Sequence, residues 1–438
     1  MKNTFVISCP LDTYSGYGAR ARDLVKAIVE LDKYDVKILS QRWGSCPFGF
    51  LDDHEEFTHL KEYIVPNLQT QPDIWMQITV PNEFQTVGKY NIGVTAAIET
   101  TACDVSWTEG CNRMDLILAS SNHSKSVLTN TVYNKIDDNT KQVIGQIRVE
   151  KPVEVLFEGI NIKKYFPLKK SQKTFSLPQI KEDFCFLFVG HWMQGDFGED
   201  RKNVGLLIKS FYETFKNKKN TPSLIMKTSG ATFSVIDKYE LLRKVNSIKD
   251  TVENAKTLPD IHILHGDLTD EEMNGLYNHP KVKAHVSFTK GEGFGRPLLE
   301  ASISGKPVIA SGWSGHLDFL NKENAILLPG QLTNVHPSSA WENVILTESK
   351  WFTVNYPVAS KVLNDVWSNY SKYEKSAKRL GISNAEKFSL DAMTTEFEKI
   401  IDKHLPQFPK QVDIKLPDLK KVTLPKKEVT NEKATTTV

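Results

Sequence analysis

Short apolar runs alternate with longer amphipathic stretches along most of the chain, and this alternation constrains the fold most strongly. In the first half, buried-strand patterns occupy residues 4–8, 36–39, 90–95, 116–119 and 153–157. In the second half they occupy residues 184–189, 223–227, 261–265, 284–288, 307–310 and 325–328. Strands that alternate with helical segments indicate parallel sheets. The sequence therefore predicts an α/β protein with two Rossmann-like, doubly wound domains that face each other across a cleft.

The predicted domain boundaries follow from length and composition. A chain of 438 residues is too long for one ordinary core. The lysine-rich segment 163–182 separates the two series of strands and is the best linker candidate. We place the first domain at residues 1–165 and the second at residues 166–385. Residues 409–438 are rich in Lys, Pro and Thr, and we expect a disordered, solvated tail there.

Composition limits the classes of function. The formal net charge of +2 gives the whole molecule no strong field for holding DNA or membrane. No apolar run reaches the roughly 18 residues that a spanning helix needs, and no signal peptide is visible. The five cysteines form no C-x-x-C pair, which favours reduced thiols in a cytoplasmic protein.

A glycine-rich loop after the predicted strand 284–288 carries the strongest chemical signal. It reads T-K-G-E-G-F-G-R-P-L-L-E, with Pro297 where the first residues of a helix belong and Gly305 where a C-cap belongs. Glycines let the backbone approach a ligand closely, and the positive end of the following helix suits a diphosphate. Glu292 lies on the loop and Glu300 lies one turn into the helix, where it could accept hydrogen bonds from hydroxyls.

The segment G-E-G-F-G-R-P-L-L-E-A, residues 291–301, resembles the E-x7-E signature of retaining glycosyltransferases of the GT-B fold, especially glycosyltransferase family 4. Residues 155–167 resemble the interdomain segment of that family. The segment F-V-G, residues 188–190, followed by Arg201-Lys202-Asn203, resembles another of its motifs. The resemblance covers the second half well, whereas the first half matches only in pattern. It further implies that a C-terminal helix at residues 386–408 crosses back to the first domain.

The resemblance assigns expected roles to these residues. Glu292 would contact the donor sugar near the reacting carbon, Glu300 would hold the ribose hydroxyls, and Lys202 would neutralise the diphosphate. The candidate donor-binding residues are Gly16, Gly18, His191, Arg201, Lys202, Gly293, Phe294, Gly295, Arg296, Pro297, Leu298 and Glu300. The candidate catalytic residues are Glu292, Lys202 and Glu99.

Two features depart from the family pattern. His191 stands where the family usually has an arginine after the glycine of the first strand, so one phosphate contact differs. The acidic, glycine-containing segment 192–200 is an insertion, and we interpret it as a candidate mobile lid.

The first domain offers a second glycine loop, S-G-Y-G-A-R-A, residues 15–21. Its G-x-G-x-x-A spacing is close to a dinucleotide fingerprint. The loop is too long for the tight turn of that motif, however, and the second strand lacks an acidic residue for a ribose. In the resembling family, a loop at this place packs against the donor diphosphate, which fits Gly16 or Gly18.

Glu99 is the acceptor-side candidate. It follows the strand at residues 90–95, at the end where parallel sheets bind ligands. Two interpretations stay open, since Glu99 could orient the acceptor hydroxyl or could act as a helix cap or interdomain hydrogen-bond partner.

No metal motif is present. The sequence contains no H-E-x-x-H, no Cys/His cluster and no clear D-x-D, and His262 and His265 are three apart on a predicted strand, so they point to opposite faces. We therefore expect no catalytic metal and no cofactor, with the nucleotide-diphosphate sugar as co-substrate.

The predicted function is the transfer of a sugar, with retained configuration, from a nucleotide-diphosphate sugar to a hydroxyl acceptor. A glycan or lipid-linked sugar is the first acceptor class, and a hydroxymethylated base in DNA is the alternative. A sugar-nucleotide-binding protein without turnover is the alternative of another class. An oxidoreductase function is supported only by the glycine loop at residues 16–21. The oligomeric state stays open.

Overall fold

A computed structural model describes residues 2–96, 98–169, 171–172, 174–230 and 234–408. Its first sheet has six parallel strands in the order β2-β1-β3-β4-β5-β8. They are β1 (Asn3–Cys9), β2 (Tyr34–Ser40), β3 (Ile74–Ile78), β4 (Tyr90–Thr95), β5 (Leu116–Ala119) and β8 (Val153–Val155). Five of these strands were predicted from the sequence, and β3 was not.

The second sheet also has six parallel strands, in the order β11-β10-β9-β12-β13-β14. They are β9 (Cys185–Val189), β10 (Ser223–Lys227), β11 (Ile261–Leu264), β12 (Val282–Ser287), β13 (Val308–Ser311) and β14 (Ile326–Leu328). All six coincide with predicted strands. The two Rossmann-like units expected from the sequence are therefore confirmed, and both belong to one compact unit, Met1–Pro406.

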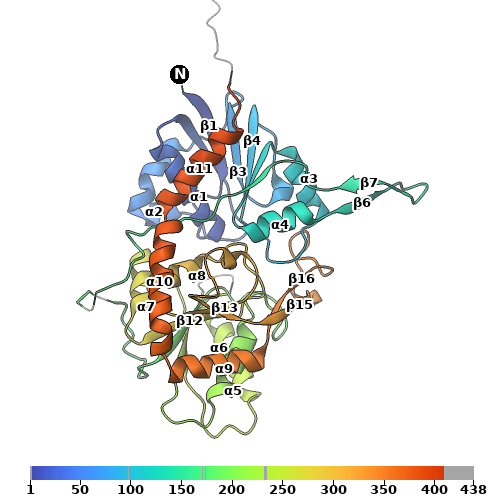
Figure 1. The fold of residues 1–438 in the computed structure, drawn as a ribbon. Coiled ribbons are helices and arrows are strands. Elements are labelled where there is room, and N and C mark those ends of the chain that lie inside the picture. The colour runs from blue at the N-terminus through green and yellow to red at the C-terminus, as the bar shows by residue number, and fades with distance from the viewer. Residues whose placement is uncertain (1, 97, 170, 173, 231–233, 409–438) are drawn as a thin grey trace, which may run out of the picture. The chain divides into compact units, whose positions relative to one another are not determined.

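Helices connect the strands (Figure 1). Those of the first half are α1 (Gly16–Glu30), α2 (Phe50–Asp53), α3 (Val105–Arg113) and α4 (Asn122–Asn130). Those that follow are α5 (Val204–Phe215), α6 (Val235–Asp250), α7 (Asp270–Asn278), α8 (Arg296–Ile303), α9 (Tyr356–Ser368), α10 (Ser371–Lys387) and α11 (Leu390–His404). Short 3₁₀ turns are η1 (Glu55–Tyr63), η2 (Pro81–Glu83), η3 (Gly315–Asp318) and η4 (Pro337–Ser339). Helix α11 contacts α1 of the first domain.

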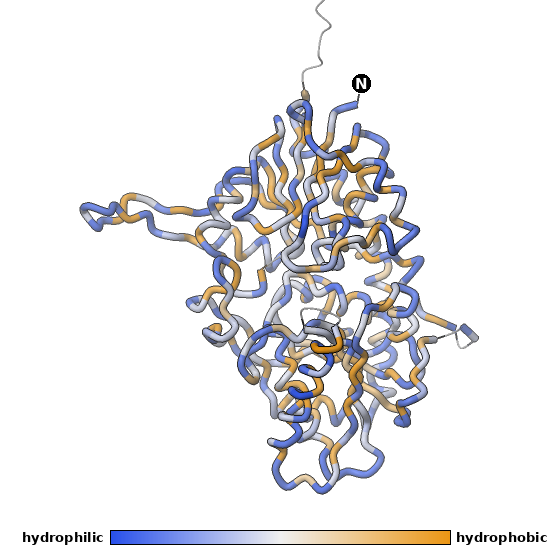
Figure 2. The backbone as a smooth tube through the Cα atoms, turned by 180° about the vertical axis from the view of Figure 1, so that it is seen from behind, coloured by the Kyte–Doolittle hydropathy of each residue, from blue (hydrophilic) through white to orange (hydrophobic). Residues whose placement is uncertain are grey.

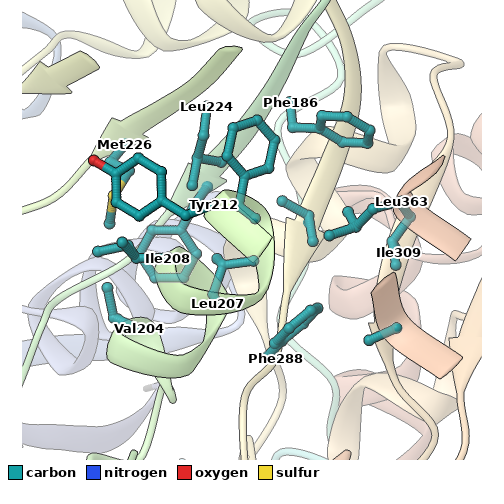
Figure 3. Packing of buried hydrophobic residues seen from close by; sticks show 14 of the residues in the cluster. Phe186, Val204, Leu207, Ile208, Tyr212, Leu224, Met226, Phe288, Ile309 and Leu363 are labelled. Atoms are coloured by element: carbon teal, nitrogen blue, oxygen red, sulfur yellow. The ribbon is translucent and has the colours of Figure 1, made fainter. Parts of the chain in front are cut away.

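Strands β9, β10 and β12 of the second sheet are buried on both faces, and successive side chains of each strand point to opposite sides. Phe186 and Phe188 of β9 pack with the apolar face of α5, to which α9 adds Leu363 (Figure 3). Cys185 and Leu187 of the same strand join the cluster on the other face, with residues of α7 and α8. This arrangement explains why the strands of the second half read as continuous apolar runs rather than alternating ones.

Two antiparallel hairpins were not predicted. One consists of β6 (Tyr133–Ile136) and β7 (Val143–Ile147), and the other of β15 (Gly330–Asn334) and β16 (Lys350–Val354). The β6–β7 hairpin projects from the first domain and carries both hydrophobic and hydrophilic residues along its length (Figure 2). The predicted tail at residues 409–438 lies outside the described residues, and the boundary between residues 165 and 166 stays a prediction.

Candidate active site

The glycine-rich loop leaves the carboxyl end of β12 and enters α8 through Gly295, whose φ of 98° lies in the left-handed region. Glycine adopts this conformation without a steric penalty. Two backbone hydrogen bonds of Glu292 anchor the loop to the start of η3. The Glu292 N–H donates to Ser314 Oγ at 2.9 Å, and the Glu292 carbonyl accepts from Gly315 N–H at 2.9 Å. Glu292 is thus fixed at a strand end, where parallel sheets bind ligands.

Lys202 and Arg201 both pair with the Glu292 carboxylate. Lys202 Nζ lies 2.5 Å from Oε1, and Arg201 Nη1 lies 3.4 Å from Oε2. Burial alone would favour a neutral carboxyl, but the charges of Lys202 and Arg201 hold the pKa of Glu292 at about 2. The structure therefore brings together two of the three predicted catalytic residues as a buried ion pair.

Glu99 reaches the same cluster from the first domain. Its Oε1 lies 3.5 Å from Arg201 Nη1. The contact between the backbones is equally close, because a Cβ at Gly291 would lie only 1.9 Å from the Glu99 carbonyl oxygen. Glu99 thus makes an ion pair with a residue of the second domain and lies beside the predicted catalytic glutamate, while its two interpretations, as an acceptor-orienting residue or as a cap or interdomain hydrogen-bond partner, stay predictions.

A second contact between the two domains involves the carbonyl of Gly293. It accepts hydrogen bonds from Ser120 Oγ at 3.2 Å and from Ser124 Oγ at 3.4 Å. Ser120 directly follows β5, so the carboxyl ends of strands from both sheets meet at the glycine loop.

Glu300 lies in a separate buried group on α8. Arg296 Nε donates to its Oε1 at 3.1 Å, and the Tyr277 hydroxyl donates to its Oε2 at 3.1 Å. Burial raises the pKa of Glu300 to about 7, against the opposing effects of Arg296 and Tyr277. Arg296 Nη1 also lies 2.5 Å from Asp23 Oδ2 on α1, so this group, too, joins the two domains.

The remaining predicted donor-binding residues differ in which of their groups could contact a ligand. Phe294 and Leu298 turn their side chains into the hydrophobic core, so only their backbone is left to face a ligand. His191 is exposed, and its Nδ1 lies 2.9 Å from Ser229 Oγ. Pro297 occupies the first turn of α8, as predicted.

The two glycines of the first loop have different surroundings. Gly16 is the exposed first residue of α1, and a Cβ there would meet no atom within 4 Å. Gly18 is buried, and a Cβ there would lie 2.4 Å from the Thr13 carbonyl oxygen. Close packing within the first domain therefore accounts for Gly18, whereas no steric contact requires a glycine at position 16.

The inserted segment 192–200 packs against the 3₁₀ turn η4. Asp196 N–H donates to Ser338 Oγ at 2.9 Å, and Ser339 Oγ donates to the Glu199 carbonyl at 2.5 Å. Its role as a lid stays a prediction.

Sequence reasoning missed Asp23 of α1, Tyr277 of α7 and Ser314 of the loop between β13 and η3, which contact the predicted site residues. Each lies outside the glycine-rich motif. The S-G-W-S-G segment at residues 311–315 was the one available signal, because its two glycines flank a turn in which Ser314 has a φ of 83°.

Two sheets of this topology, in contact through a glycine loop and a following helix, define the two-domain GT-B fold. Solved structures agree, although at 12–15% identity they are evidence for the fold alone. HepE of Anabaena, in complex with UDP and glucose, is 14% identical with a TM-score of 0.52, over 92% of this chain and 100% of that one. Sucrose-phosphate synthase of Thermosynechococcus elongatus is 12% identical with a TM-score of 0.57, over 92% and 99%. A glycosyltransferase of Rickettsia africae ESF-5 is 15% identical with a TM-score of 0.55, over 92% and 99%.

Residues 173–334 match the family described as glycosyl transferases group 1. This segment contains Lys202, the glycine loop and Glu300. No curated protein matches the sequence. The protein is a glycosyltransferase with the GT-B fold.

Among the helices of the described ranges, none is both long enough and apolar enough to cross a lipid bilayer.

Proposed function

We propose that the protein transfers a sugar from a nucleoside-diphosphate sugar to a hydroxyl acceptor with retained configuration. One observation carries the proposal: two cations, Lys202 and Arg201, surround the buried carboxylate of Glu292 at the entrance to α8. A diphosphate needs such positive charge, and a developing sugar cation needs such a carboxylate. The UDP in the Anabaena HepE structure makes UDP-sugars the first donors to test.

In the proposed reaction, the bond between the anomeric carbon and the β-phosphate oxygen breaks, and a bond to the acceptor oxygen forms on the same face of the sugar. The acceptor proton passes to the departing phosphate. Lys202, Arg201 and the N-terminus of α8 stabilise the charge on the leaving diphosphate, so the proposed step needs no metal. Glu292 stabilises the positive charge on the sugar, and Glu300 holds the ribose hydroxyls.

The acceptor would enter from the first domain. Glu99 is the carboxylate of that domain that reaches the reaction centre through Arg201. We propose a glycan or lipid-linked sugar as the acceptor class, with Glu99 orienting its hydroxyl. A hydroxymethylated base in DNA is the second class for an acceptor screen.

The test is donor binding and donor hydrolysis with a panel of UDP-, GDP- and ADP-sugars. It compares the wild type with Glu292→Gln and with Glu386→Gln, an exposed glutamate of α10 that serves as the matched control. We expect one nucleotide class to raise the melting temperature of all three proteins, and only Glu292→Gln to lose hydrolysis. If the wild type binds the donor and transfers its sugar neither to water nor to any acceptor, the protein is a binding protein and the proposal is wrong.

The stereochemical part of the proposal has its own test. Once an acceptor is found, the anomeric configuration of the product is read by proton NMR from the coupling constant of the new glycosidic bond. An inverted product would refute retention while leaving the transferase activity intact.

A further inference from the structure

A second cluster of charged side chains lies at the opposite ends of the strands from the glycine loop. Asp260 directly precedes β11 and His262 is its second residue, so the two side chains point to the same face of this edge strand. Glu182, three residues before β9, joins them from the linker side. One ligand atom from each of the three residues lies within 4.8 Å of the others.

The geometry of this group suits a metal ion. His262 Nε2 lies 3.3 Å from Glu182 Oε2. In tetrahedral zinc sites the metal–ligand distance of about 2.1 Å places neighbouring ligand atoms about 3.4 Å apart. The pair already has the spacing of two zinc ligands, and a carboxylate oxygen of Asp260 lies within 4.8 Å of a ligand atom of each.

The negative charges of Glu182 and Asp260 also favour a bound cation. Glu182 and Asp260 each offer a carboxylate oxygen within 4.8 Å of the other, and two ionised carboxylates this close repel each other unless a proton or a cation lies between them. A divalent cation would balance both, and a neutral imidazole would supply the third ligand. One nitrogen and two carboxylate oxygens are ligands that Zn²⁺ accepts readily.

We propose that Glu182, Asp260 and His262 bind a Zn²⁺ ion that fastens the linker to the edge of the second sheet. The ion would be structural, because the ligands lie where β9 and β11 begin, whereas Lys202, Glu292 and Glu300 lie beyond the strand ends. His265 is not part of the site, since its Nε2 lies 2.8 Å from Asp237 Oδ2.

The experiment titrates the metal-free full-length protein with ZnCl₂ by isothermal calorimetry and records the visible spectrum with CoCl₂. It compares the wild type with His262→Ala and Glu182→Gln, which keeps the shape of the side chain and removes its charge. His59→Ala is the control, because it removes an exposed histidine of the first domain.

We expect one equivalent of Zn²⁺ in the wild type and in His59→Ala, with an increase in melting temperature that EDTA reverses. Loss of a direct ligand should weaken binding by at least about tenfold, as even outer-shell changes do. The cobalt spectrum should show d–d bands without a thiolate charge-transfer band, which excludes binding to the cysteines. Less than one equivalent in the wild type, or equal affinity in all four proteins, would overturn the proposal.

Discussion

Lys202 Nζ lies 2.5 Å from Glu292 Oε1, and the two side chains are only 10% and 8% exposed. Lys202 therefore depends on Glu292 for a charged partner, whereas Glu292 has Arg201 as a second cation. The pair connects Lys202, two residues after the inserted segment 192–200, to the glycine loop.

The first prediction concerns this ion pair. Lys202→Met should lower the free energy of unfolding by about 3–5 kcal/mol, because it leaves a buried carboxylate without its nearest partner. The double variant Lys202→Met/Glu292→Gln should regain much of that loss, since it buries no unpaired charge. Urea denaturation measures both effects. Donor hydrolysis should be absent in both variants, and a single variant as stable as the wild type would show that the pair is not buried as described.

The second prediction tests the contact between Gly291 and Glu99. Gly291→Ala places a Cβ 1.9 Å from the Glu99 carbonyl oxygen, so the two backbones must separate. We expect loss of donor hydrolysis and a lower melting temperature. Gly145→Ala is the control, because a Cβ there meets no atom within 4 Å. Equal activity in the two variants would mean that the domains need not touch here during the reaction.

The third prediction follows from Glu300. Its pKa is about 7 in the folded protein and 4.5 in its ordinary state, so between these values the folded protein binds more protons than the unfolded chain. The contribution of Glu300 to the free energy of unfolding therefore falls as the pH rises through this window, by about 3 kcal/mol in total.

Glu300→Gln removes this titration. Relative to the wild type, the variant should gain stability between about pH 4.5 and pH 7, measured by urea denaturation at a series of pH values. The donor affinity of the wild type should rise as the pH rises through this window, because only the ionised Glu300 carboxylate accepts hydrogen bonds at both oxygens. A difference in stability that does not change with pH would refute the raised pKa.

The fourth prediction is a double-mutant cycle on Asp23 and Arg296, which join α1 to α8. Asp23→Asn and Arg296→Gln should show a coupling energy of about 1–3 kcal/mol in urea denaturation, since the contact is short and partly buried. The exposed pair Lys26 and Glu30 on α1, 3.8 Å apart, is the control and should couple by less than about 0.5 kcal/mol. Additive effects at Asp23 and Arg296 would show that the bridge does not hold the domains together.

The sequence predicted the second domain better than the first, for a physical reason. Its six strands alternate regularly with helical segments, and its glycine loop places three glycines directly before the start of α8. The β3 run I-W-M-Q-I lies between the 3₁₀ turns η1 and η2, so the alternation of strands with longer helical stretches that revealed the other strands is missing there. The β15–β16 hairpin was missed because β15, G-Q-L-T-N, is exposed and polar.

The candidate site shows the same division. Glu292, Glu300 and Lys202 were found because they belong to local motifs. Asp23 lies outside the glycine motif at the start of α1 and reaches Arg296 across the two domains, and Tyr277 reaches Glu300 through the packing of α7 against α8. No local pattern can predict a contact that depends on how two domains meet.

The hydrogen bonds to the Gly293 carbonyl have a consequence for the neighbouring amide. A trans peptide plane points its carbonyl and its N–H in opposite directions. With the carbonyl turned toward Ser120 and Ser124, the N–H of Phe294 is turned away from the first domain. If the first domain moves off, this plane loses its two anchors and is released to rotate. The orientation of one peptide group of the second domain is thus set by two hydroxyl groups of the first.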